Sequence, residues 1–312
     1  MHRIPSASRR IDLLLLAVAA VWGASFVVAK DLTAEIGVPS TIALRFAIAA
    51  GAAGLLCALR RERMPGGRGL TIAVLLGLSQ AAVIGLETWG VYLTSATNAG
   101  LLISLALVMT PALEGLASRS WLPRSYFVTA VAAVVGVALL VSEGGLRAPT
   151  AGDALVILAA VVRALHVTAS ARLTRGRADS SLAVVFVQML VCAAAFSLFA
   201  GPALPTAVAT LGGSGWLSIA FLGLLCSLFA FLVQLWAVRR TSASRASILM
   251  GAEPIWAVVI GVVVSGETVG TAGLIGAVVI VTATYAGQAI ERRQREGAST
   301  RRAAPRSSTS TV

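Results

Sequence analysis

The stretch SSLAVVFVQMLVCAAAFSLFAGPALPTAVATLGGSGWLSIAFLGLLCSLFAFLVQLWAV, residues 180–238, contains no Asp, Glu, Lys or Arg. Its 59 residues far exceed the roughly 20 that one helical crossing of a bilayer needs. A turn between two crossings is favoured by Pro202, Pro205, Gly212 and Gly213. The whole chain is 57% hydrophobic and 12% charged, far from the balance of a soluble domain. These features predict an all-α integral membrane protein.

The same length criterion, applied along the chain, predicts ten transmembrane helices. They are expected at residues 11–29, 38–59, 70–92, 98–118, 124–142, 153–172, 182–200, 216–237, 246–265 and 269–289. The sixth is interrupted by Arg163 and His166. We keep it, because without it the Arg-rich C-terminal tail would lie on the side of the membrane opposite to the other basic loops.

Basic residues are distributed very unevenly between the two predicted sides. With the N-terminus in the cytoplasm, 21 of the 25 basic residues fall in cytoplasmic loops and tails, as the positive-inside rule requires. The net charge of +12 therefore indicates orientation in a membrane rather than a nucleic-acid surface. We expect a multi-pass protein of the plasma or inner cell membrane, with both termini cytoplasmic and no nucleic-acid partner.

A short motif occurs twice, as WGVYLTSATNAGLL at Trp89–Leu102 and as WAVRRTSASRASIL at Trp236–Leu249. The copies lie 147 residues apart, and only the second contains Arg. Ten spans leave five for each copy, and an odd number makes the second half begin on the opposite side of the membrane. The sequence thus predicts two five-helix repeats of inverted topology.

The expected organisation follows from these repeats. It comprises a cytoplasmic N-terminus, a first repeat, an extracytoplasmic linker, a second repeat and a disordered basic tail in the cytoplasm. The corresponding residues are 1–10, 11–142, 143–152, 153–289 and 290–312. The tail is rich in Arg, Ser and Thr and poor in apolar residues, a composition typical of disorder.

Motifs for catalysis are lacking in the sequence. The three cysteines fall within apolar spans, and neither metal-ligand spacing nor a nucleophile motif occurs. Lys30 is not part of a phosphate-binding Gly-rich loop. We therefore expect no enzymatic activity, no catalytic residue, no metal site and no cofactor, with coupling to protons or ions left open. The alternatives are a passive channel, which would favour rings of polar groups, and a membrane-embedded enzyme acting on lipid-linked substrates.

Several segments together resemble the EamA-type branch of the drug/metabolite transporter superfamily. They are VWGASFVVAK at 21–30, ALRFAIAAG at 43–51, TSATNAGLLISLALVMTP at 94–111, TSASRASILMGAEPIWAVVIGVVVSGE at 241–267 and GLIGAVVIVTATY at 273–285. The resemblance implies a secondary carrier of two five-span repeats that moves small organic solutes, often outward, by alternating access. Expected partners are the lipid bilayer and a small-molecule substrate, such as a metabolite, an amino-acid-like compound or a drug, and the oligomeric state is left open.

Ionisable side chains inside spans are the leading candidates for substrate binding or gating, because a charge near the bilayer centre tends to face a cavity or a partner. From their distances to the span ends, Arg45 is expected near Glu87, and Arg163 near Glu253. His166 lies one turn after Arg163, and this polar face suits an anionic or zwitterionic substrate. The alternative for each group is a structural role in a buried ion pair.

Four tryptophans are further candidates, as residues that line a cavity. They are Trp22, Trp89, Trp236 and Trp256. The alternative for each is packing between helices.

Overall fold

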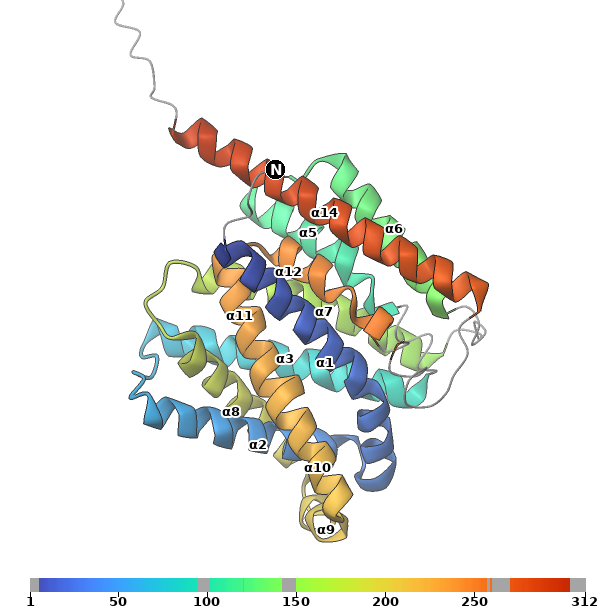
Figure 1. Ribbon diagram of the computed structural model, residues 1–312. Helices are drawn as coiled ribbons and strands as arrows, with labels where there is room; N and C mark the ends of the chain where they lie inside the picture. The colour runs from blue at the N-terminus through green and yellow to red at the C-terminus, as the bar shows by residue number, and fades with distance from the viewer. Residues whose placement is uncertain are drawn as a thin grey trace, which may run out of the picture.

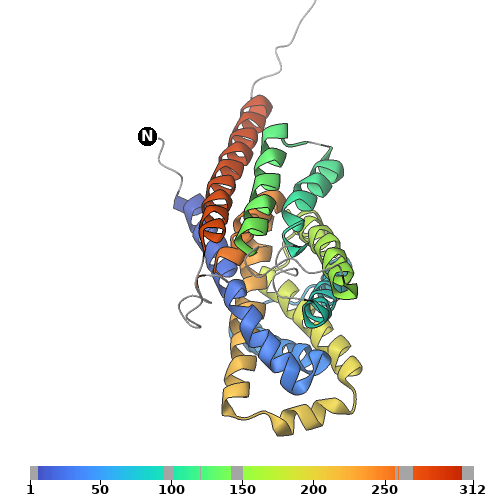
Figure 2. The same ribbon diagram turned by 90° about the vertical axis from the view of Figure 1, so that its right-hand side faces the viewer.

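The computed structural model describes residues 6–94, 102–119, 121–141, 150–256, 259 and 270–303, and within them it is a bundle of helices without strands (Figures 1 and 2). The first half contains α1 (Ser6–Ile36), α2 (Val38–Leu59), α3 (Arg68–Leu93), α5 (Ala106–Ser118) and α6 (Arg124–Val141). The second half contains α7 (Ala151–Thr174), α8 (Ser181–Ala200), α9 (Ala203–Thr210), α10 (Gly213–Phe221), the π-helix η2 (Leu222–Phe229), α11 (Ala230–Arg240), α12 (Ala243–Met250) and α14 (Thr271–Ala303).

Six of the described helical stretches are long and apolar enough to cross a membrane. They are α2, α3, α7, α8, the continuous stretch Gly213–Arg240 and the part of α14 from Thr271 to Glu291. α1 adds a seventh if its two arms, which meet at 43°, form one span, whereas α5 and α6 are apolar but shorter. The chain therefore has the helices of a multi-pass membrane protein, and the number of ten spans stays a prediction.

Helices of the two halves pack against each other in pairs. α2 packs along α8, α3 along both α7 and α8, and α6 along α14; Figure 1 shows α14, in red, beside α6, in green. Glycine permits the closest approaches, because small residues let helix backbones come together. A Cβ atom on Gly136 of α6 would lie 2.9 Å from the carbonyl oxygen of Gly276, and one on Gly77 of α3 would lie 2.8 Å from Val191.

The largest buried cluster joins α1 and α2 to α8, η2 and α11. Within it, Phe46 of α2 stacks on Phe231 of α11, with ring centroids 6.3 Å apart. Trp22 of α1 packs on the same Phe231 ring at 5.6 Å. Aromatic pairs at such distances contribute roughly 0.5–1.5 kcal/mol beyond the burial of their area. This packing fixes α1, α2 and α11 around the centre of the bundle.

The structure departs from the predicted spans at three places. The predicted span 216–237 contains the π-helix η2, in which the Ser227 hydroxyl donates to the Leu222 carbonyl at 2.9 Å. The predicted turn near residues 202–213 includes the short helix α9, which lies across the end of the bundle between α8 and α10 (Figure 2). At the end of the chain, α14 continues to Ala303, past the predicted span end at residue 289.

The predicted span 246–265 is not one continuous helix. α12 ends at Met250, and helical structure resumes only at residues 253–256. Pro254 lacks the backbone N–H that a continuing helix would use, so it fits the start of a new helical turn better than a helix interior. Residues 95–101, which hold much of the first copy of the repeated motif, and residues 260–269 lie outside the described residues.

Candidate functional site

Three charged side chains meet inside the bundle, and we call Glu87, Arg163 and Glu253 the central cluster. The Nη2 atom of Arg163 on α7 lies 2.7 Å from Oε2 of Glu87 on α3. Its Nη1 atom lies 3.6 Å from Oε2 of Glu253. The exposed fractions of the side chains are 18%, 14% and 8% for Arg163, Glu87 and Glu253. The guanidinium of Arg163 on α7 thus joins α3 of the first half to the segment after α12 of the second half, and all three side chains are mostly buried.

The central cluster corrects one predicted pairing. The expected contact between Arg163 and Glu253 is present, but Glu87 binds Arg163 and not Arg45. Arg45 instead donates from Nε to the Ser227 hydroxyl at 3.0 Å, and its guanidinium carbon lies 5.3 Å from the centroid of the Phe46 ring. The reason is helix packing: α3 packs along α7, whereas α2 packs along α8 and η2.

The π-helix η2 positions two candidate residues of the first half. Trp22 donates from Nε1 to the carbonyl oxygen of Cys226 at 2.9 Å, and Arg45 reaches Ser227 one residue further on. A π-helical turn changes the register of the backbone hydrogen bonds and occurs frequently at functional sites. On its other side, the Trp22 ring lies under Arg163, whose guanidinium carbon is 5.3 Å from the ring centroid. Trp22 therefore links η2 to the central cluster.

His166 is buried one turn after Arg163 and has partners of its own. Its Nδ1 atom lies 2.8 Å from the Ser79 hydroxyl on α3, and its Nε2 atom lies 3.5 Å from the Ser170 hydroxyl on α7. This predicted site residue therefore joins α7 to α3, and its hydrogen-bond partners among the described residues are the two serines rather than Glu87 or Glu253.

The other three candidate tryptophans differ from Trp22 in their surroundings. Trp89 packs against Phe196 and Phe199 of α8, with ring centroids 6.1 Å and 6.4 Å away. Trp236 lies at the Arg-rich end of α11, where the Arg240 guanidinium carbon is 4.6 Å from its ring. Trp256 is 38% exposed. Of the four tryptophans, Trp22 is the one that the structure places against the guanidinium group of Arg163.

A cavity of about 230 Å³ opens beside Glu87. Its charged lining consists of Lys30 of α1, Arg45 of α2 and Glu87 of α3, and polar side chains such as Thr33 and Thr88 complete it. Cationic and anionic groups in one small cavity can hold the two ends of a zwitterion by charge-assisted hydrogen bonds. Glu87 faces both this cavity and Arg163, so it connects the cavity to the central cluster.

At the opposite end of α7, a polar network surrounds residues Thr241–Arg245, which include the α11–α12 connection and the start of α12. We call this network the Arg245 lock. Arg245 is 7% exposed and makes a bidentate pair with Asp12 of α1, with Nε–Oδ1 at 3.0 Å and Nη2–Oδ2 at 2.8 Å. The backbone N–H of Ser244 donates to Glu114 of α5 at 2.7 Å. The Ser242 hydroxyl donates to Glu291 of α14 at 2.6 Å.

The Arg245 lock and the cavity beside Glu87 are at different ends of the bundle. Thr94, which lines that cavity, donates to Asp153 at the start of α7 at 2.6 Å. Arg175, directly after α7, donates to the carbonyl of Thr241 in the lock at 2.9 Å. The 24 residues of α7 separate these contacts by about 36 Å at 1.5 Å per residue. Near the lock, a second cavity of about 410 Å³ lies between α5 and α7 and is lined by Ala117 and Thr168.

Within the part of the chain that the structure describes, no group of three or more His, Cys, Asp or Glu side chains is placed to hold a metal ion.

Comparison with known proteins identifies the family. A model of the EamA-like transporter family matches residues 9–142 and 150–286. A crystal structure of another protein superposes with a TM-score of 0.74 at 19% sequence identity, over 92% of this chain and 99% of that one, which shows a shared fold. No match to a curated protein sequence is found. Because the family model covers most of the chain in two successive copies, the protein belongs to the EamA-like transporter family, whose members are membrane transporters of small molecules.

Proposed function

We propose that this protein is a secondary carrier that moves a small zwitterionic solute, such as an amino-acid-like metabolite or drug, out of the cell by alternating access. The observation that carries the proposal is the central cluster, in which Arg163 is shared by two carboxylates. One of them, Glu87, also faces a cavity that is lined by the cationic side chains of Lys30 and Arg45. Ionisable groups within spans are expensive to keep and mark substrate pathways. Outward direction rests on the family resemblance.

The cavity suggests how a zwitterion would bind. The carboxylate of the solute would pair with Arg45, and its ammonium group would compete with Arg163 for Glu87. Arg163 already lies 3.6 Å from Glu253 and would then move fully to that second carboxylate. When solute is bound, Arg163 would exchange its partner on α3, Glu87, for Glu253 after α12. Because Glu253 belongs to the same half as Arg163, this exchange would weaken the connection between the two halves. Binding would thereby favour a change in how the halves pack.

The two ends of the bundle support alternating access. The described structure has a cavity beside Glu87 at one end and the closed Arg245 lock at the other. By the positive-inside rule, the Arg-rich end with the lock is the cytoplasmic one, and both termini lie there. This arrangement fits a carrier whose cytoplasmic ends of α1, α5 and α14 are held together by the Arg245 lock. Opening would break the pair of Arg245 with Asp12 and widen the cavity near Ala117.

The pairing of helices supports two inverted repeats of five spans. If α1, α2, α3, α5 and α6 correspond in order to α7, α8, the stretch Gly213–Arg240, the α12 segment and α14, then α2 packs on its own counterpart and α6 on its own counterpart. Contacts between equivalent elements are expected near a pseudo-two-fold axis. In this topology, the short helices α5 and α6 and the interrupted α12 segment complete the ten spans.

A ligand screen followed by flux measurements tests the proposed function. Purified protein would be heated with zwitterions, with amines that lack the carboxylate and with acids that lack the amine. A ligand at 100 times its dissociation constant adds about 2.7 kcal/mol of stability, and we expect only zwitterions to do so. Stabilising solutes would then be tested for counterflow in proteoliposomes, with Glu87→Gln expected to abolish it and the exposed Glu35→Gln to leave it intact. Flux that increases linearly without saturation would contradict a carrier.

A further inference from the structure

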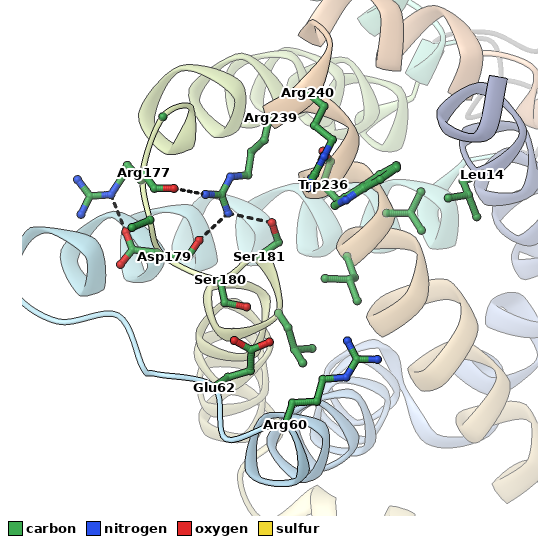
Figure 3. A pocket seen from close by; sticks show the side chains of 15 residues that line it. Leu14, Arg60, Glu62, Arg177, Asp179, Ser180, Ser181, Trp236, Arg239 and Arg240 are labelled. Atoms are coloured by element: carbon green, nitrogen blue, oxygen red, sulfur yellow. Dashed lines mark hydrogen bonds and ion pairs between the residues drawn. The ribbon is translucent and has the colours of Figure 1, made fainter. Parts of the chain in front are cut away.

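A third and larger cavity, of about 660 Å³, lies at the Arg-rich end of the bundle where the ends of α2 and α11 meet the start of α8. Figure 3 shows this surface, which we call the arginine cavity. It is lined by four guanidinium groups, from Arg60, Arg177, Arg239 and Arg240, and by two carboxylates, from Glu62 and Asp179, which leaves a net charge of +2. Neither the central cluster nor the Arg245 lock contributes a lining residue.

Two of the four arginines build the wall of the arginine cavity. Arg239 donates to the carbonyl oxygens of Arg177 and Asp179 at 2.7 and 2.8 Å and to the Ser181 hydroxyl at 2.8 Å. Arg177 pairs with the Asp179 carboxylate at 2.7 Å. These contacts, drawn as dashed lines in Figure 3, hold the α7–α8 connection against the end of α11. The charge of Arg177 is therefore paired within the protein, and Arg239 donates to three acceptors of the protein.

The other two arginines keep their charge available. Among the described residues, neither Arg60 nor Arg240 has a carboxylate within ion-pair distance. Arg60 follows α2 and is exposed, and Arg240 lies over the ring of Trp236 at 4.6 Å. In Figure 3 the two lie at opposite edges of the arginine cavity. A guanidinium that is not paired within the protein offers a planar fork of donors that matches a phosphate.

The position and the apolar lining of the arginine cavity indicate which kind of molecule carries such an anion. α2, α8 and the stretch Gly213–Arg240 are candidate membrane spans, and all three have an end here. The cavity is also lined by the apolar side chains of Leu14, Leu182 and Leu232. Trp236 lies between the charged and apolar parts, a position that tryptophan favours at membrane interfaces. The cavity thus combines a cationic rim at the ends of three candidate spans, where lipid headgroups are expected, with an apolar lining.

We propose that the arginine cavity binds the headgroup of an anionic phospholipid. The anionic headgroup would lie between Arg60 and Arg240 and be attracted by both, and the first part of an acyl chain would lie against Leu182 and Leu232. Basic cavities between spanning helices at the cytoplasmic side recognise anionic headgroups by this chemistry. A free phosphate shares the polar contacts but leaves the apolar wall uncovered. The bound lipid would bridge α2 of the first half to α8 and α11 of the second.

Lipid titration of the delipidated, purified protein, followed by native mass spectrometry, tests this proposal. The probes are phosphatidylglycerol and phosphatidylcholine with identical acyl chains, together with inorganic phosphate as a competitor. We expect phosphatidylglycerol to bind at least about tenfold more tightly than phosphatidylcholine. In the double variant Arg60→Gln/Arg240→Gln the affinity for phosphatidylglycerol should fall roughly 30-fold, because each lost charge weakens binding about fivefold. The matched control is Arg63→Gln/Arg124→Gln, which removes two exposed arginines that do not line the cavity.

Three results would overturn the proposal. They are equal affinity of the wild-type protein for the two lipids, unchanged affinity of the double variant for phosphatidylglycerol, and complete displacement of the lipid by millimolar inorganic phosphate. The last result would show an anion site that does not require lipid. Thermal unfolding of each variant verifies folding, and because the preference of the wild-type protein needs no substitution, the test holds even if a variant does not fold. The outcome is independent of which solute the protein carries.

Discussion

Replacing Arg163 by Met removes the shared cation of the central cluster and leaves Glu87 and Glu253 without their partner. Methionine keeps the apolar stem of the arginine, so the main change is the loss of charge. Removing one partner of a buried ion pair costs about 3–5 kcal/mol, because it leaves an uncompensated buried charge. The cluster is 18% exposed or less at each side chain, so this buried-pair range applies. The apparent melting temperature should fall by on the order of 10 °C, at about 2–4 °C per kcal/mol.

A triple variant separates stability from transport. Combining Arg163→Met with Glu87→Gln and Glu253→Gln removes every charge of the central cluster, and replacing a whole buried ion pair by neutral groups is often nearly neutral for stability. We therefore expect the triple variant to recover most of the lost melting temperature. Neither variant should transport solute. Both lack Arg163, and the triple variant also lacks the Glu87 carboxylate that is proposed to bind the ammonium group.

Thermal unfolding in one fixed detergent and solute counterflow in proteoliposomes measure these two effects on the same preparations. A single variant that melts within about 1 °C of the wild type would show that Arg163 does not compensate the two carboxylates. A triple variant that transports at the wild-type rate would show that the central cluster only holds helices together. Both variants need comparable yields of monodisperse protein before their fluxes are compared.

Three further substitutions test the surrounding structure. Trp22→Phe removes the side-chain hydrogen bond to the Cys226 carbonyl, so thermal unfolding should show a loss of about 0.5–1.5 kcal/mol. Gly136→Ala places a Cβ atom 2.9 Å from a backbone oxygen of α14 and should destabilise the protein by about 1–3 kcal/mol. The control Gly51→Ala places its Cβ atom where nothing lies within 4 Å and should be neutral or slightly stabilising. Equal melting temperatures of the two variants would contradict close packing of α6 and α14. Asp12→Asn weakens the pair with Arg245 and should increase labelling of a cysteine at Ala117 by a cytoplasmic reagent, and unchanged labelling would argue against a lock.

The family and the all-helical membrane character follow directly from the sequence, and the family match confirms both. Charge-free runs longer than one crossing leave few alternatives to spanning helices. The placement of individual side chains is harder to predict. Depth along a span suggested Arg45 as the partner of Glu87, but depth does not say which helices are neighbours. α3 packs along α7, and this non-local packing places Glu87 within ion-pair distance of Arg163.

The π-helix η2 had no usable signal in the sequence, and the Arg245 lock had only a partial one. Ser227 is a single hydroxyl in an apolar segment, and its bond to Leu222 becomes meaningful only with Arg45 beside it. Asp12 lies near the start of the first predicted span, a position where a solvated charge is ordinary. In the structure it pairs with Arg245, which is 233 residues away. A sign of the lock does exist in the repeated motif, because Arg245 replaces the Asn98 of the first copy. Its partner could not be identified without the fold.

Alternating access itself is tested most directly by solute-dependent labelling from the two sides of the membrane. Single cysteines would be introduced at Thr88, which lines the cavity beside Glu87, and at Ala117, which lines the cavity near the Arg245 lock, after replacement of the three buried native cysteines. The carrier mechanism predicts that Thr88→Cys reacts from the outer side and Ala117→Cys from the cytoplasmic side. A transported solute should change the two rates in opposite directions. Simultaneous fast labelling at both positions, unaffected by solute, would contradict the mechanism and indicate a continuous pore.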